Sequence, residues 1–208
     1  PPYLTLALGA GAVTPLQMAG AYAVFANGGY KVNPYLISKI TDTTGKVLAQ
    51  ARPDTADDEA NRVIDERNAF LMDSMLRDVV RFGTATKALV LKRPDIAGKT
   101  GTTNDSVDNW FAGYQPTLAA VVWMGYDNPK TLGESETGGR LSLPVWIGFM
   151  ETALKGVPVM EPAAPEGVVN VGGEWFYEEN TRGAGITGLG LEDKLPEAGT
   201  NDEEKKGI

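Results

Sequence analysis

Two apolar runs separated by three residues constrain the fold of this chain most strongly. Residues 110–114 and 118–126 are rich in aromatic and β-branched side chains, which favours strands. The connection at 115–117 is too short for a parallel crossover, so the two strands are expected to pair antiparallel. Segment 96–103 is a third β-prone stretch, punctuated by two glycines. Trp110, Phe111, Trp123 and Trp146 are interpreted as core aromatics.

Helices are predicted around this sheet from their capping signals. Thr14 and Gln17 form a capping box, and Pro15 suits a first helical position. The expected helices begin at Pro15, after Asp65 and at Ser142, and end before Asn27, at Gly83 and at Gly156. Two further strands are expected at 35–41 and 47–49. The pattern predicts an α+β fold with helices packed on an antiparallel sheet.

The composition excludes several classes of chemistry. The 208 residues include no histidine and no cysteine, which rules out a Ser-His-Asp triad, a Cys-His dyad, zinc fingers and disulfides. A metal held by carboxylates alone stays open, but no metal and no cofactor are expected. A net charge of −8 argues against binding to a nucleic-acid backbone. No apolar run is long enough to predict a membrane span.

The negative charge is concentrated at the end of the chain. Residues 161–208 hold most of the net charge, and few large apolar side chains follow Tyr177. Such a composition is typical of a poorly packed segment. We therefore expect a folded part at 1–168 and an acidic, flexible tail at 169–208.

Gly98-Lys99-Thr100 is the segment with the clearest chemical potential. A phosphate-binding P-loop would need a glycine five positions before Gly98, where the chain has Arg93, and a helix after the lysine. Neither requirement is met. The remaining interpretations are an ordinary sheet edge with a solvated lysine, or a strand that lines a substrate cleft.

The cleft interpretation has a direct physical basis. Lys99 would offer a fixed positive charge to a substrate carboxylate. Thr100 and Thr102 alternate along the strand, so their hydroxyl groups would face the same side. Gly101 lets a substrate approach the backbone. A backbone N–H of such a strand can stabilise a developing oxyanion.

The sequence around this strand resembles the transpeptidase domain of class A penicillin-binding proteins, whose family carries a Lys-Thr-Gly strand. The most specific match is 97–105, with Thr103-Asn104-Asp105 following the lysine strand. The resemblance covers residues 4–168, and its other motifs lie at 6–9, 13–19, 21–30, 75–80, 83–85, 108–114, 122–127 and 137–139. It implies a penicillin-binding/β-lactamase-like transpeptidase fold.

The resemblance also implies a reaction. Family members are peptidoglycan D,D-transpeptidases, in which a serine attacks the D-Ala–D-Ala bond of a stem peptide, releases D-Ala and passes the acyl group to an acceptor amine. β-Lactam antibiotics resemble the donor. By this resemblance Lys99 supports acylation, Thr100 and Thr102 bind the carboxylate, Gly101 leaves room, and the Thr102 N–H is an oxyanion donor. Three further residues are expected at the rim of the cleft: Thr103, Thr137 and Gly138.

The chain departs from the family in one serious respect. The nucleophile motif Ser-x-x-Lys and the second motif Ser-x-Asn occur nowhere in the 208 residues. The chain therefore resembles the C-terminal half of the domain, and the serine and base lysine are expected from a preceding fragment of the same protein. The isolated chain is predicted to be inactive. Residues 84–87 have Thr-x-x-Lys spacing and are interpreted as a surface turn.

Two alternatives stay open at this point. The chain could belong to a non-catalytic penicillin-binding-like scaffold or sensor, or to a relative of the β-lactamases and carboxypeptidases, which the class A flanks disfavour. The resemblance further implies a glycosyltransferase domain and an N-terminal membrane anchor outside this chain. With these the protein would act at the periplasmic face of the bacterial inner membrane, on stem peptides and β-lactams.

Overall fold

The computed structural model describes residues 4–9, 11–56 and 58–181. Its helices are α1 (Pro15–Ala26), α2 (Glu66–Arg81) and α3 (Ser142–Ala153). Its strands are β1 (Lys39–Thr41), β2 (Val47–Gln50), β3 (Ala97–Thr102), β4 (Asn109–Gln115), β5 (Leu118–Met124), β6 (Val168–Val171) and β7 (Glu174–Tyr177). Short 3-10 segments are η1 (Leu4–Leu8), η2 (Glu59–Asn61), η3 (Thr86–Leu91), η4 (Asn104–Ser106) and η5 (Glu178–Asn180).

The central sheet has the strand order β3-β4-β5, and both pairs are antiparallel. The register places Thr100 opposite Phe111 and Phe111 opposite Val122. The antiparallel pairing expected from the short connection at 115–117 is therefore confirmed. With the three helices, it also confirms the predicted α+β fold.

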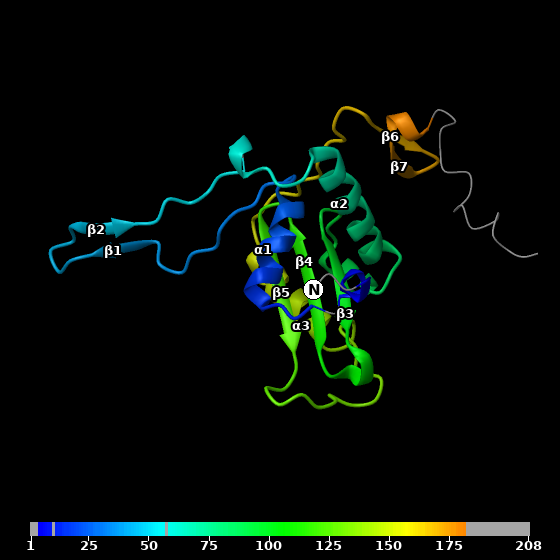
Figure 1. The fold of residues 1–208 in the computed structure, drawn as a ribbon, viewed down its shortest axis with the longest axis horizontal. Coiled ribbons are helices and arrows are strands. Elements are labelled where there is room, and N and C mark those ends of the chain that lie inside the picture. The colour runs from blue at the N-terminus through cyan, green and yellow to red at the C-terminus, as the bar shows by residue number, and fades with distance from the viewer. Residues whose placement is uncertain (1–3, 10, 57, 182–208) are drawn as a thin grey trace, which may run out of the picture.

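Helices pack on both faces of this sheet (Figure 1). On one face, α1 and α2 contribute Tyr22 and Leu76, which pack with Tyr114. On the other face, Trp146 of α3 packs edge-on against Phe111, with ring centroids 4.9 Å apart. Both of these aromatic residues are fully buried. Each face thus has its own apolar cluster, and the sheet is the middle layer.

The predicted capping of α1 is present, but the burial of this helix is unusual. The Gln17 N–H donates to the Thr14 hydroxyl at 3.2 Å, and the Thr14 N–H donates to Gln17 Oε1 at 2.9 Å. Apart from Gln17 the helix has no polar side chain, yet none of its side chains is fully buried. A helix that is apolar on all sides normally lies inside a protein, so the outer side of α1 is an incompletely covered surface.

Strands β1 and β2 form an arm that projects from the rest of the molecule (Figure 1). Every residue of both strands is exposed, and Leu36 beside them is 97% exposed. A two-stranded hairpin is marginally stable by itself in water. This arm therefore gains little from the core of the described fold.

The segment after Val168 begins with ordered structure. Strands β6 and β7 pair antiparallel, and Trp175 packs edge-on against Phe70 of α2 at 5.0 Å between ring centroids. Arg67 donates to Glu179 at 3.0 Å. The expected flexible tail begins at residue 169, but these contacts place residues 175–179 against α2. The rest of that tail, 182–208, lies outside the described residues, and the domain boundary stays a prediction.

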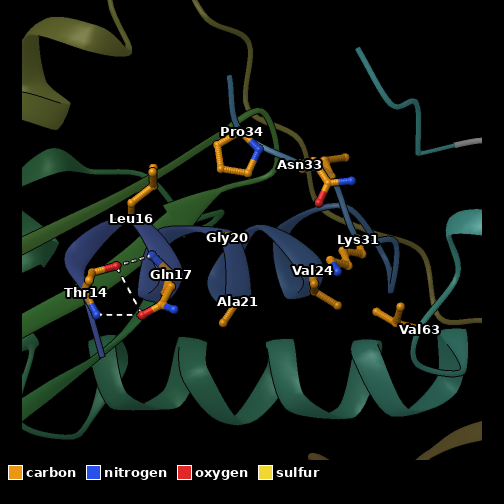
Figure 2. Close-up of a pocket in the computed structure, with 11 residues that line it drawn as sticks. Thr14, Leu16, Gln17, Gly20, Ala21, Val24, Lys31, Asn33, Pro34 and Val63 are labelled. Atoms are coloured by element: carbon orange, nitrogen blue, oxygen red, sulfur yellow. Dashed lines mark hydrogen bonds between the residues drawn. The ribbon is translucent and has the colours of Figure 1, made fainter. Parts of the chain in front are cut away.

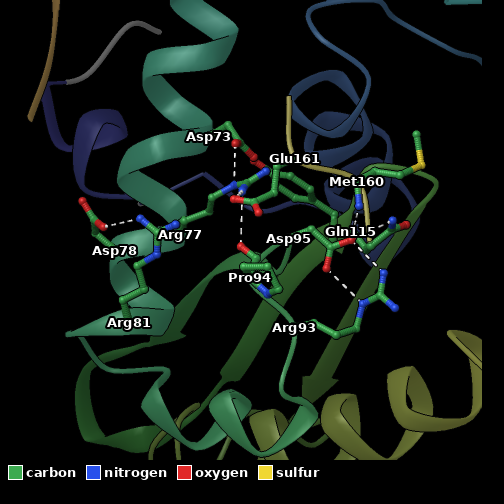
Figure 3. A network of polar contacts seen from close by, with 11 residues as sticks. Asp73, Arg77, Asp78, Arg81, Arg93, Pro94, Asp95, Gln115, Met160 and Glu161 are labelled. Atoms are coloured by element: carbon green, nitrogen blue, oxygen red, sulfur yellow. Dashed lines mark hydrogen bonds and ion pairs between the residues drawn. The ribbon is translucent and has the colours of Figure 1, made fainter. Parts of the chain in front are cut away.

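A buried carboxylate fastens the segment after α3 to the sheet (Figure 3). Asp95 accepts from Arg93 Nε at 2.9 Å and Nη2 at 2.7 Å, from Gln115 Nε2 at 3.1 Å and from the Met160 N–H at 3.0 Å. Arg93 also donates to the carbonyl of Val157 at 2.8 Å. Burial acts to raise the pKa of Asp95, but these hydrogen bonds outweigh it and hold that pKa below its usual range.

Replacing this carboxylate is expected to destabilise the fold. All hydrogen-bond partners of Asp95 are N–H donors, and in Asp95→Asn one carboxylate oxygen becomes an NH₂ group that cannot accept from them. We therefore expect the free energy of unfolding to fall by about 2 kcal/mol at pH 7. Because folding lowers the pKa of Asp95, the stability that the wild-type carboxylate contributes is fully present above about pH 5 and is lost as the pH falls. The deficit, measured by urea titration, should shrink as the pH falls. Asp127→Asn, at an exposed position, is the control; an equal deficit in both variants would contradict the assignment.

Candidate functional site

Strand β3 carries the predicted cleft residues and has β4 as its one sheet neighbour among the described residues. The Thr103 N–H donates across the ladder to the Asp108 carbonyl at 3.0 Å. Backbone groups alternate in direction along a strand, so those of Thr100 and Thr102 point away from β4. The Thr102 N–H therefore faces the free edge of the sheet.

The side chains of β3 divide between the two faces of the sheet. Thr100 and Thr102 lie on the face that α3 covers, since Thr100 is paired with buried Phe111. Lys99 is paired with Ala112 and starts from the opposite face, which α1 and α2 cover. The lysine and the two threonines therefore approach the edge of the strand from opposite sides.

The ammonium group of Lys99 reaches back to this edge. Its Nζ donates to the carbonyl oxygen of Thr100 at 3.0 Å, and its side chain is exposed. Because the Thr100 carbonyl points away from β4, the positive charge lies beside the outward-facing backbone groups. The free edge of β3 thus combines one cation, two hydroxyl groups and the outward-facing N–H groups of Thr100 and Thr102, which together suit an anionic ligand.

The segment at 137–139 lies directly on the strand. The Gly138 N–H donates to the Thr102 hydroxyl oxygen at 3.1 Å. A Cβ at Gly138 would overlap the Trp110 carbonyl oxygen and come within 2.6 Å of the Gly101 carbonyl oxygen, so the close approach requires glycine here. The structure therefore brings Thr137 and Gly138 next to the lysine strand.

Thr103 has a different role from its neighbours in the strand. Its hydroxyl group accepts from the Asp108 N–H at 2.8 Å, inside the turn that joins β3 to β4. Asp105 and Ser106 in that turn have positive φ angles of 58° and 51°. Asp108 also accepts from Trp123 Nε1 at 2.8 Å. Thr103 is thus engaged in ordering the turn.

Residues 84–87, interpreted as a surface turn, are exposed apart from Ala85, and two of them also contact the site. The hydroxyl oxygens of Thr84 and Thr100 are 2.6 Å apart. Lys87 Nζ donates to the Gly139 carbonyl at 3.1 Å. No local pattern could have indicated these contacts, because α2 and η3 must first return the chain to β3.

A buried polar cluster holds α2 on the sheet away from this edge (Figure 3). Tyr114 donates to Asp73 Oδ1 at 2.9 Å, and Arg77 Nε lies 2.7 Å from Asp73 Oδ2. Burial raises the pKa of Asp73, and burial together with the Asp73 charge raises the pKa of Tyr114.

Among the described residues no cluster of three potential metal ligands occurs, and no described helix meets the length and hydropathy of a membrane span.

The decisive comparison is with protein families. The family model described as "Penicillin binding protein transpeptidase domain" matches residues 2–147, which include the whole lysine strand. The chain belongs to this transpeptidase family. The resemblance found in the sequence is thereby confirmed.

Individual members of the family match over most of the chain. Penicillin-binding protein 1A of Neisseria flavescens is 49% identical over 179 residues, or 86% of this chain and 22% of the relative. The Pseudomonas aeruginosa protein of the same name is 43% identical over 82% of this chain and 26% of the relative. This penicillin-binding protein chain therefore spans about a quarter or less of the curated relatives it matches.

Solved structures agree with the fold. Penicillin-binding protein 1A from Haemophilus influenzae matches with a TM-score of 0.77 and 35% identity over 83% of this chain and 33% of that chain. Penicillin-binding protein A from Mycobacterium tuberculosis, solved as an imipenem acyl-enzyme complex, matches with a TM-score of 0.52 and 24% identity. The latter supports the fold alone.

Proposed function

We propose that this chain supplies the lysine–threonine–glycine wall of a peptidoglycan D,D-transpeptidase site, the target of β-lactam antibiotics. The observation that carries the proposal is the free edge of β3. There the Lys99 ammonium group lies at the Thr100 carbonyl, beside the outward-facing N–H of Thr102. Membership of the transpeptidase family supports the same assignment.

The residues of this wall would divide the work of acylation. Lys99 and the hydroxyl groups of Thr100 and Thr102 would bind the carboxylate of the donor peptide or drug. The Thr102 N–H would stabilise the oxyanion that forms when the serine oxygen attacks the carbonyl carbon. Gly101 would leave room for the substrate backbone, with Thr137 and Gly138 at the rim. The serine–carbonyl bond forms, the carbon–nitrogen bond of the substrate breaks, and the leaving nitrogen takes a proton.

The nucleophile must come from another part of the protein, which we infer to be the preceding part of the same polypeptide. The curated relatives are several times longer than this chain, and Ser-x-x-Lys is missing from it. The outer side of α1 offers a surface for that part: Leu16, Gly20 and Val24 line a groove of about 510 Å³. Pro34 and Val63 also line this groove; in Figure 2, Pro34 lies above α1 and Val63 lies beyond Val24, near the end of the helix.

The rest of the protein would place this activity in the cell envelope. A membrane anchor and a glycosyltransferase domain in other parts of the polypeptide would hold the transpeptidase at the periplasmic face of the inner membrane, among peptidoglycan strands. A non-catalytic scaffold or sensor is the second candidate. Covalent labelling of the complete protein by a penicillin would exclude it.

The carboxylate-binding role of Thr102 gives a direct test. In the complete protein, Thr102→Val is expected to slow acylation by benzylpenicillin about 10-fold, because a hydrogen bond to a charged group is lost. Second-order rate constants from a fluorescent competition assay would measure this. Thr102→Ser keeps the hydroxyl group and should react within about 2-fold of wild type. An unchanged rate in Thr102→Val would remove this residue from the site.

A further inference from the structure

We infer that Thr84 is a positioning residue for the carboxylate-binding hydroxyl of Thr100. This inference rests on the proposed function of the β3 edge. The two hydroxyl oxygens are 2.6 Å apart, and sixteen residues of sequence separate them. Thr84 does not lie on the lysine strand, and the sequence pattern around it predicts a simple turn.

The direction of this hydrogen bond follows from the chemistry of a hydroxyl group. A threonine hydroxyl has one proton to donate and can accept as well. If Thr100 donates its proton to a carboxylate, it can only accept from Thr84. Thr84 would therefore be the donor, and its bond would hold the Thr100 proton toward the ligand. Hydrogen bonds in such a chain polarise and strengthen one another.

The neighbouring threonine is arranged in the same way. The hydroxyl oxygen of Thr102 accepts from the Gly138 N–H, which leaves the proton of Thr102 to donate to a ligand. Each of the two hydroxyl groups on this face of β3 thus has a partner outside the strand. In one case the partner is the backbone of 137–139, and in the other it is the side chain of Thr84.

The turn that carries Thr84 is fixed at both ends. The Ala85 N–H donates to the Val79 carbonyl of α2 at 3.1 Å, and Ala85 is fully buried. Gly83 lies so close to α2 that a Cβ there would come within 2.9 Å of Val79 Cα. Lys87 adds the bond to the Gly139 carbonyl. Thr84 is therefore presented to Thr100 by a rigid turn, which is what a positioning role requires.

The test compares two substrates in the complete protein. Benzylpenicillin has the carboxylate, and its methyl ester lacks the negative charge. Thr84→Val, which keeps the shape of the side chain, is expected to slow acylation by benzylpenicillin about 5-fold and to leave the slow reaction with the ester unchanged. Thr84→Ser should restore the wild-type rate. Thr86→Val, at an exposed position two residues along, is the matched control and should react as wild type.

Each other outcome has a defined meaning. Equal slowing with both substrates would show a general structural effect and overturn the positioning role. A wild-type rate in Thr84→Val, with Thr100→Val slowed, would overturn this inference and leave the proposed function standing. Wild-type rates in both variants would count against the proposed carboxylate site itself. Melting temperatures of all variants, compared with wild type, would identify any loss of folding.

Discussion

A fluorescent penicillin is expected to leave the isolated chain without covalent label. The chain contains five serines, and none is followed by a lysine three positions later: Ser38, Ser74, Ser106, Ser135 and Ser142. Without that lysine no base is placed to activate the hydroxyl group. The edge of β3 can contribute electrostatic stabilisation, but stabilisation without a nucleophile forms no acyl-enzyme.

Adding the preceding part of the polypeptide should restore the reaction. When the two parts are produced together, label is expected on the part that carries Ser-x-x-Lys and not on this chain. Gel fluorescence and intact-mass measurement of each part would show where the drug is attached. A serine-to-alanine change in the Ser-x-x-Lys motif is the control. Label on the isolated chain would contradict the division of the site between the two parts.

Among the site residues that this chain supplies, removal of the Lys99 ammonium group should have the largest effect of any single substitution. In the complete protein, Lys99→Ala is expected to slow penicillin acylation about 100-fold, because one preorganised electrostatic contact typically contributes about 3 kcal/mol to the transition state. The side chain is exposed and donates to one backbone carbonyl. The stability of the fold should therefore change by less than about 0.5 kcal/mol.

The measurement should separate the charge of Lys99 from its other contributions. Second-order acylation constants would be compared at low and high salt, since screening weakens an exposed charge. The wild-type rate should fall with salt more steeply than that of Lys99→Ala. Lys155→Ala, which removes an exposed lysine on the segment after α3, is the matched control. A wild-type rate in Lys99→Ala would exclude the lysine from the site.

Much of the fold could be predicted because its signals are local. The capping box at Thr14 and Gln17, the cap at Asp65 and the short connection at 115–117 each specify the structure of a few neighbouring residues. The order of these elements along the chain then limited the possible strand orders of the central sheet. Lys99, Thr100 and Thr102 could be proposed as site residues from the sequence for the same reason, since they lie on one continuous strand.

The remaining contacts depend on residues that are distant in the sequence. Thr84 meets Thr100, and Trp175 meets Phe70, because helices and turns return the chain to the same place. Burial also depends on what lies beyond a strand: Trp123 was expected in the core but is 36% exposed. It lies on β5, whose outer edge has no strand partner among the described residues.

The projecting arm of β1 and β2 makes the molecule convenient for optical work. The chain contains no cysteine, so a thiol introduced at Thr43, in the exposed turn of the arm, would be unique within it. A fluorophore attached there would lie away from the central sheet β3-β4-β5, so its emission would depend on the environment of the arm alone. Its emission and anisotropy would then report whether the arm becomes covered when the rest of the polypeptide is present.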